Sequence, residues 1–162
     1  MLRHVHFPEF RDMNAPRFTQ RRHTFSMVCR VEVEIRTVPG RVWTLLTDAE
    51  AFPRWNSTVT HIEGEIREGE RLRIHVPGTT RTFTPTVSHF AASEHMTWSG
   101  GLSPLFKGVR TFQLRPIGVA ATLFSMEERF SGLIFALLKG TMPDFDPIFR
   151  RYASDLKQEA ER

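Results

Sequence analysis

The sequence predicts an α+β domain in which a seven-stranded antiparallel sheet wraps around one long C-terminal helix, with two short helices between the first two strands. Apolar residues alternate along a series of short segments, and the links between these segments are short. The last segment instead has a helical period. Because parallel neighbours need long crossover connections, the short links indicate antiparallel pairing. A chain of 162 residues is sufficient for one such domain.

The first predicted strand is the segment CRVEVEIRT, residues 29–37. Its apolar side chains stand at alternate positions and charged side chains fill the positions between them, which is typical of a half-buried strand. Cys29 lies on the apolar face, so we expect it to be a small core residue. A single cysteine excludes an internal disulfide and fits a reducing compartment, so a cytoplasmic location is expected.

Helices are expected before and after the remaining strands in the sequence. Pro39 can start a first short helix, and Asp48 can cap a second. A short apolar helix follows Gly132, and it is either a lid or membrane-touching door or an ordinary packing element. The long helix begins at Asp146-Pro147. Its expected apolar stripe consists of Ile148, Phe149, Tyr152, Leu156 and Ala160.

Six further strands complete the predicted sheet. Four of them occupy residues 58–66, 71–76, 81–90 and 95–100, with plausible tight turns between them. The last two, FKGVRTFQLRP and AATLFSMEERF, are expected to form a long hairpin around Ile117-Gly118.

The net charge of +4 is unevenly distributed along the chain. Residues 1–26 carry five arginines and two acidic residues, whereas the rest of the chain is close to neutral. We expect residues 1–26 to be a disordered basic leader, which an upstream start codon would explain because Met27 precedes the first strand. The domain then spans residues 27–162. Since nucleic-acid binding needs a clustered basic surface, no nucleic-acid partner is expected.

No metal site or cofactor is expected. His61, Glu63 and Glu65 alternate along one strand, where their spacing of about 7 Å is too wide for a single ion, so a solvated face is the interpretation. The sequence contains no nucleophile elbow, phosphate-binding glycine loop or paired-cysteine zinc motif.

Four segments carry a resemblance to a known family. TVPGRVWTLLTDAEAFPRWN, IEGEIREGERLRI, LFKGVRTFQLRPIG and TLFSMEERFSGL resemble, in order and spacing, the SRPBCC family. This is the START/Bet v 1-like, polyketide cyclase and lipid-transport superfamily, and the likeness covers about residues 27–160. The resemblance implies the helix-grip fold. It does not fix the function, because members bind lipids, hormones or polyketides, catalyse reactions or assist chaperones without a common catalytic motif.

The hairpin places one charged pair on its inner face. If Phe112 opposes Phe124, then Arg110 opposes Met126, and Arg110 and Glu128 become diagonal neighbours. The other face of the hairpin is polar and belongs in water, so Glu128 points inward. An unpaired inward carboxylate is costly. Three readings stay open: an ion pair that only fixes register, a polar anchor for a ligand, or a catalytic acid or base.

The preferred function is the binding of a small hydrophobic ligand, such as a lipid, a polyketide or an aromatic, in a cavity between the sheet and the C-terminal helix. The alternatives are an enzyme that uses the same cavity, of the polyketide cyclase, aromatase, dehydratase or hydrolase kind, and a protein-interaction module of the cochaperone kind with a filled core. A monomer or homodimer without stable membrane insertion is expected. The expected ligand contacts are Arg110, Glu128, Trp98, Phe112, Phe124, Met126, Phe83, Ile74, Met96 and Tyr152, with Arg110 and Glu128 as weak catalytic candidates.

Overall fold

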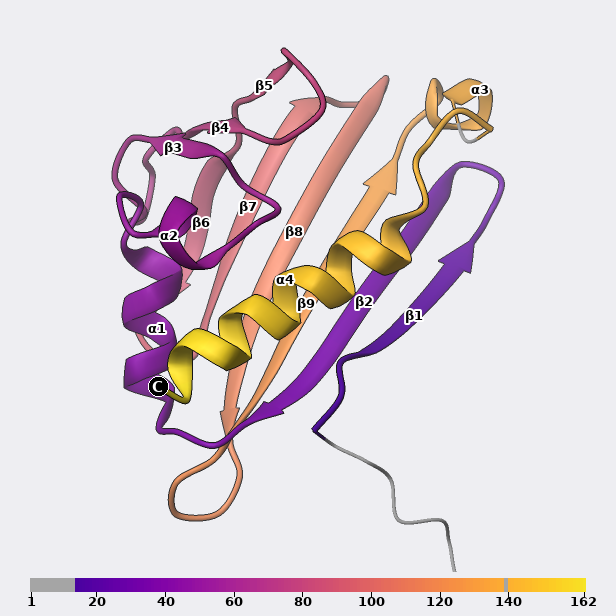
Figure 1. Ribbon diagram of the computed structural model, residues 1–162. Coiled ribbons are helices and arrows are strands. Elements are labelled where there is room, and N and C mark those ends of the chain that lie inside the picture. The colour runs from indigo at the N-terminus through magenta and orange to yellow at the C-terminus, as the bar shows by residue number, and fades with distance from the viewer. Residues whose placement is uncertain (1–13, 139) are drawn as a thin grey trace, which may run out of the picture.

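The computed structural model describes residues 14–138 and 140–162. A six-stranded antiparallel sheet, in the order β1-β2-β9-β8-β7-β6, carries the long helix α4 diagonally across one face (Figure 1). A separate three-stranded sheet, in the order β3-β4-β5, lies beside the short helices. The bounds are β1 Arg17–Arg22, β2 Ser26–Ile35, α1 Pro39–Thr47, α2 Phe52–Trp55, β3 His61–Glu63, β4 Arg73–His75, β5 Thr82–Phe83, β6 Thr86–Ala91, β7 His95–Leu102, β8 Phe106–Pro116, β9 Thr122–Ser131, α3 Phe135–Leu138 and α4 Phe145–Ala160.

The predicted α+β class, the antiparallel pairing and the long C-terminal helix are confirmed. The strand count differs, because the described residues form nine strands in two sheets. Pro85 is one physical reason for the difference. It lacks an N–H group and interrupts the predicted strand 81–90, so that β5 pairs with β4 while β6 pairs with β7.

Strand β1 lies where the sequence predicts a disordered leader without strands. It pairs with β2 along its whole length, and its Phe18 ring packs edge-on against Phe149 at a centroid distance of 5.6 Å. Because β1 is a polar edge strand with a single large apolar side chain, it has no period that the sequence could reveal. Residues 1–13 lie outside the described residues, and the start-codon interpretation stays a prediction.

The β8–β9 hairpin has the predicted faces but a different register. Phe112 pairs with Met126 instead of Phe124, and Arg110 pairs directly with Glu128. The register differs by two residues because the connecting loop is longer than a tight turn at Ile117-Gly118, with the N–H of Ile117 bonded to the carbonyl of Ala121. A shift of two residues leaves every side chain on its predicted face.

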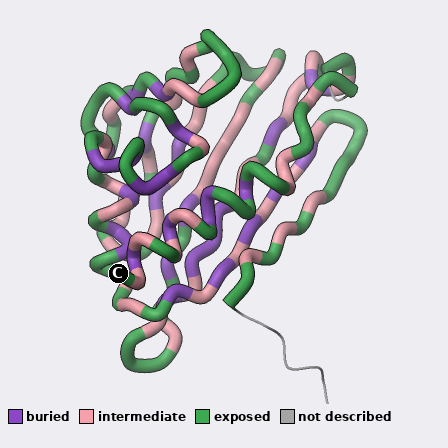
Figure 2. The backbone as a smooth tube through the Cα atoms, viewed as in Figure 1, coloured by how far each residue is buried: buried purple, intermediate pink, exposed green. Residues whose placement is uncertain are grey.

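Helix α4 presents its predicted stripe to the sheet with one exception. Its N-cap is Asp144, whose carboxylate accepts a hydrogen bond from the N–H of Asp146 at 3.1 Å. Ile148 is exposed, so its assignment to the buried stripe is wrong, and Ala153 is buried instead. Buried residues follow the inner positions of the strands and one side of α4 (Figure 2).

The C-terminal end of α4 is tied to the sheet through Glu161. Its carboxylate accepts hydrogen bonds from the backbone N–H of Arg36, at 2.8 Å, and from the ammonium group of Lys157. Burial alone would raise the pKa of Glu161, but these donors outweigh burial, and its pKa lies below the ordinary value. The ionised form of Glu161 is therefore favoured by folding.

We expect Glu161→Gln to reduce the free energy of unfolding by about 1 kcal/mol at pH 7. Because the folded-state pKa lies below the unfolded one, the contribution is present above the unfolded pKa and is lost as the pH falls through the folded pKa. Urea unfolding at several pH values should therefore show a difference that shrinks towards acid. A difference that stays constant with pH, or one that the exposed control Glu50→Gln reproduces, would contradict this.

Candidate functional site

Four neighbouring strands each place one residue in a single row on the inner face of the large sheet. Cys29, Glu128, Arg110 and Trp98 are register partners across β2, β9, β8 and β7. Burial, together with the negative charge of Glu128, raises the pKa of Cys29 to about 12. Cys29 is fully buried, as predicted, and its thiol stays protonated. The row thus contains one charged pair, with the largely apolar Cys29 on one side and Trp98 on the other.

Arg110 and Glu128 are joined by two hydrogen bonds, but some of their hydrogen-bonding atoms are unused. Nε and Nη2 of Arg110 donate to the same carboxylate oxygen of Glu128, Oε2, at 3.0 and 2.6 Å. Within the described residues, Oε1 of Glu128 and Nη1 of Arg110 make no hydrogen bond. The side chains of Arg110 and Glu128 are 26% and 14% exposed, so solvent reaches the pair. One donor nitrogen and one acceptor oxygen without hydrogen bonds are therefore available to a third group.

The surroundings of Arg110 keep it charged. Burial lowers the pKa of Arg110, but the charge and the hydrogen bonds of Glu128 outweigh burial and raise it above the ordinary value. The guanidinium carbon lies 5.8 Å from the ring centroid of Phe149 on α4, which is within the range of a cation–π contact. Arg110 thus contacts the sheet on one side and the helix on the other.

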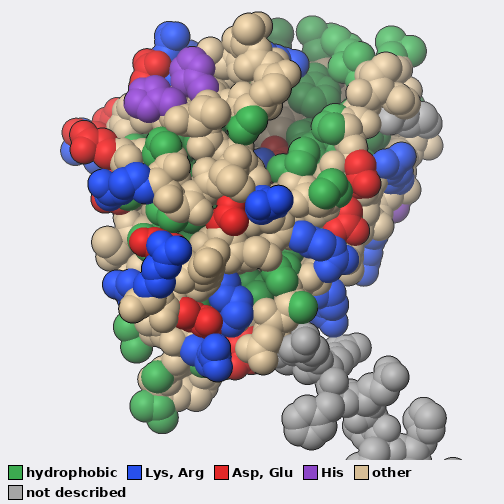
Figure 3. All heavy atoms as spheres, in the orientation of Figure 1, with side chains coloured by type: hydrophobic (Ala, Val, Ile, Leu, Met, Phe, Trp, Pro, Cys, Tyr) green, Lys and Arg blue, Asp and Glu red, His purple; other side chains and the backbone are tan. Residues whose placement is uncertain are grey.

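Space beside the pair comes from Gly108. A Cβ atom at this position would lie 3.8 Å from the Phe130 ring and 4.0 Å from Oε1 of Glu128. Any side chain larger than a methyl group would therefore cover the free oxygen. Figure 3 shows a recess on this face of the molecule, with hydrophobic atoms at its rim and acidic and basic atoms at its floor.

Aromatic rings fill the middle of the space between α4 and the large sheet. The Tyr152 ring lies 5.8 to 6.4 Å, between centroids, from Phe52, Trp55, Phe112 and Phe124. The expected cavity is therefore closed along this part of the helix. Solvent reaches the end that contains Arg110 and Glu128.

Several polar atoms in this aromatic cluster have no hydrogen-bond partner within the described residues. They include the Tyr152 hydroxyl and the indole N–H groups of Trp55 and Trp98. Burial raises the pKa of Tyr152, and the positive charge of Arg110 offsets part of this effect, so the phenol stays neutral. Buried donors without partners are costly and rare.

The other predicted contact residues divide into three groups. Met96, Phe112, Phe124 and Met126 are fully buried core residues. Ile74 is buried in the small sheet, where it pairs with Phe83. Phe83 is exposed under the guanidinium of Arg81, so its predicted inward orientation is wrong, because β5 belongs to the separate small sheet. The ligand-binding roles of the predicted residues stay predictions.

Sequence reasoning missed two aromatic residues that shape the site. The sequence pattern places Phe149 in the apolar stripe of α4 but not among the expected ligand contacts, although its distance of one helical turn from Tyr152 is a usable signal. Phe52 lies in the four-residue helix α2, which is too short to show any period. Its ring packs against Trp98 at a centroid distance of 6.2 Å, and only the tertiary structure reveals this contact.

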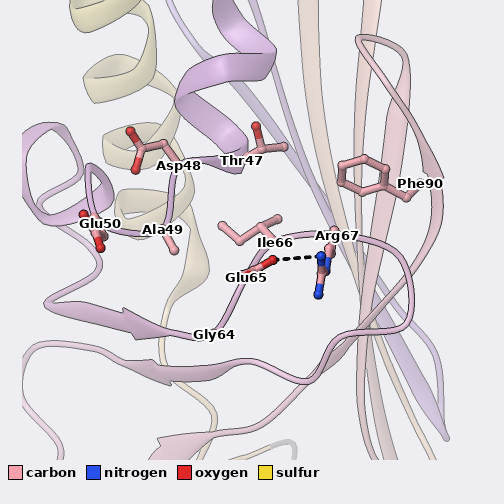
Figure 4. A pocket seen from close by; sticks show the side chains of 9 residues that line it. All are labelled: Thr47, Asp48, Ala49, Glu50, Gly64, Glu65, Ile66, Arg67 and Phe90. Carbon is pink, nitrogen blue, oxygen red and sulfur yellow. Dashed lines mark ion pairs between the residues drawn. The ribbon is translucent and has the colours of Figure 1, made fainter.

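Two hollows on the outside of the molecule do not include the charged pair. One, of about 410 Å³, is lined by residues 47–50, 64–67 and Phe90 (Figure 4), and its lining includes the Glu65–Arg67 ion pair at 3.1 Å. The other, of about 690 Å³, is lined by residues 39–40, 92–95 and 113–116. Neither lining includes Arg110 or Glu128.

The candidate metal residues do not form one cluster: Glu65 lies outside β3 and pairs with Arg67, and the His61 ring stacks on His75. Glu63 binds Arg73 at 3.1 Å and contacts His75 at 3.2 Å. Among residues 14–138 and 140–162, no group of three His, Cys, Asp or Glu side chains is arranged to hold a metal ion.

Residues 27–161 match the model of the family described as "Polyketide cyclase / dehydrase and lipid transport". No curated protein sequence matches the chain. The match covers almost all of the chain that the structure describes, including the whole row on the inner face.

Several solved structures have a similar fold. A conserved protein of unknown function from Enterococcus faecalis is 20% identical, with a TM-score of 0.66 over 89% of this chain and 77% of that one. A START superfamily protein from Mycobacterium smegmatis is 19% identical, with a TM-score of 0.61 over 83% and 97%. Norcoclaurine synthase from Thalictrum flavum, in complex with dopamine and hydroxybenzaldehyde, is 15% identical, with a TM-score of 0.62 over 85% and 88%. At these identities the similarity concerns the fold.

Proposed function

The chain belongs to the polyketide cyclase, dehydrase and lipid transport family, and from this premise we propose that it binds a small hydrophobic molecule whose polar end contacts Arg110 and Glu128. The observation that carries the proposal is the half-buried, unsaturated ion pair on an otherwise apolar inner face. A pair that only fixed register would need no free donor and acceptor beside a recess.

The charge of the pair defines which polar end it accepts. Arg110 and Glu128 together are neutral, so a ligand needs no charge to balance them. A hydroxyl group can accept a hydrogen bond from Nη1 of Arg110 and donate one to Oε1 of Glu128. A ligand carboxylate would instead be repelled by Oε1. The proposed guest is therefore a neutral hydroxyl compound, such as a phenol, an enol or an alcohol, attached to an apolar body.

The apolar body of the guest is stabilised by burial between sheet and helix. The walls beside the pair are Phe130 on β9 and Phe149 on α4, both largely or fully buried. Burial contributes about 25 cal/mol per Å² of apolar surface, before the costs of association are subtracted. The complex of norcoclaurine synthase with dopamine and hydroxybenzaldehyde supports the view that this fold can hold small aromatic molecules.

We expect 2-naphthol to bind more tightly than naphthalene or 2-naphthoate. Quenching of tryptophan fluorescence measures all three affinities in parallel. Arg110→Met should weaken 2-naphthol binding about tenfold through loss of one charged hydrogen bond and leave naphthalene binding almost unchanged. The matched control is Arg115→Met, because Arg115 is exposed on the same strand. If none of the three compounds binds, the proposed function fails.

A further inference from the structure

Exposed apolar side chains gather at one end of the molecule, which we call the apolar tip. It consists of the β1–β2 turn, the β7–β8 turn and the segment around α3, which lie at the same end of the large sheet (Figure 1). Figure 3 shows hydrophobic atoms grouped at this end. Six of the ten large hydrophobic side chains that are exposed in the described residues belong to the apolar tip: Phe25, Leu102, Leu105, Leu133, Leu137 and Leu138.

Backbone hydrogen bonds join the three parts of the apolar tip into one surface. The N–H of Gly132 bonds to the carbonyl of Phe25 at 3.1 Å, and the N–H of Leu133 bonds to the carbonyl of Pro104 at 3.1 Å. The close approach requires a glycine, because a Cβ atom at Gly132 would lie 2.3 Å from the carbonyl oxygen of Leu105. The exposed leucines are therefore held in place relative to one another.

The charge of the segments that build the apolar tip has a single sign. Residues 21–27, 102–107 and 129–142 contain no aspartate or glutamate, although they contain three arginines and two lysines. Arg22, Lys107 and Arg129 are exposed. These segments carry a net charge of +5 in a chain whose net charge is +4, so the basic excess of the chain belongs to them.

We propose that the apolar tip docks on an anionic membrane surface. Its leucines would enter the boundary between headgroups and acyl chains, while its basic side chains contact lipid phosphates. No helix in the described part of the chain is long and apolar enough to cross a bilayer. A symmetric contact with a second copy is disfavoured, because it would bring two surfaces of the same charge together.

The test measures binding of the full chain to vesicles of phosphatidylcholine, with and without phosphatidylglycerol, by flotation. We expect binding only to the vesicles that contain phosphatidylglycerol, and weaker binding at high salt. Leu137→Ser should reduce the affinity about tenfold. Lys107→Gln and Arg129→Gln should each reduce it about fivefold. The matched control is Val119→Ser, because Val119 is fully exposed outside the tip, in the β8–β9 loop.

Two results would overturn the proposal. The first is binding that does not depend on phosphatidylglycerol, or no binding to either vesicle. The second is a Leu137→Ser variant that binds vesicles as the unmodified chain does but changes the oligomeric state in sedimentation, which would assign the surface to a contact between copies. Either result leaves the ligand proposal intact, because that rests on naphthol binding.

Discussion

Replacing Glu128 with alanine is expected to lower the free energy of unfolding by about 2 to 3 kcal/mol, because Arg110 would remain half-buried without its partner. The expected loss is below that of a fully buried pair, since solvent reaches both side chains. Urea unfolding of the full chain measures the effect. Glu127→Ala is the matched control, because the neighbouring residue lies on the opposite face and forms only weak surface ion pairs.

The double variant Arg110→Met, Glu128→Met distinguishes two contributions to the free energy of unfolding: the cost of leaving Arg110 without a partner, and the net contribution of the ion pair. If desolvation dominates, the double variant should be more stable than Glu128→Ala, since two apolar side chains remain in the same place. Equal destabilisation by Glu128→Ala and Glu127→Ala would show that the pair is not held in a low-dielectric site. The proposed binding of a ligand's polar end by Arg110 and Glu128 would then have no half-buried pair to support it.

Phe112→Ala is expected to cost about 3 to 5 kcal/mol, because it removes a fully buried ring from the aromatic cluster around Tyr152. The unfolding midpoint in urea, at unchanged slope, measures this loss. A cost below about 1 kcal/mol would mean that the interval between α4 and the sheet is not packed as described.

Tyr152→Phe should behave in the opposite way and leave stability unchanged or slightly higher. The Tyr152 hydroxyl is buried without a hydrogen-bond partner within the described residues, so its removal ends a desolvation cost. Substantial destabilisation by Tyr152→Phe would show that the hydroxyl has a partner in solution.

The inward orientation of Arg110 and Glu128 could be predicted from the sequence because it depends on alternation alone. Apolar and polar residues alternate along β8 and β9, and a shift of two residues in pairing does not change the faces. The direct pairing itself could not be predicted, since it depends on the conformation of a loop that has no hydrophobic period.

Other features were hidden from the sequence for reasons of tertiary structure. Strand β1 has one large apolar residue, Phe18, and becomes visible only through its pairing with β2. The exposure of Phe83 follows from the division of the strands into two sheets at Pro85. The aromatic cluster depends on Phe52, which comes from a helix of four residues. Only the contact of Phe52 with Trp98 joins segments far apart in the sequence, because β1–β2 and β4–β5 are neighbouring strands along the chain.

The packed aromatic cluster around Tyr152 also helps to distinguish between the alternative functions that the sequence predicts. A packed interior is what a protein-interaction module of the cochaperone kind predicts, and the middle of the α4 interval fits that description. The end that contains Arg110 and Glu128 does not, because it is solvent-accessible and has a free donor and a free acceptor. The proposed ligand site is thus confined to this end.

The central claim is that a hydroxyl compound binds against the Arg110–Glu128 pair, and a crystal structure with 6-bromo-2-naphthol tests it most directly. Anomalous scattering from bromine locates the bound compound without any prior assumption about its position. The account predicts the naphthol ring between the large sheet and α4, with its oxygen in hydrogen-bond contact with Arg110 or Glu128. A bromine peak in either outer hollow, with the inner recess unchanged, would contradict it.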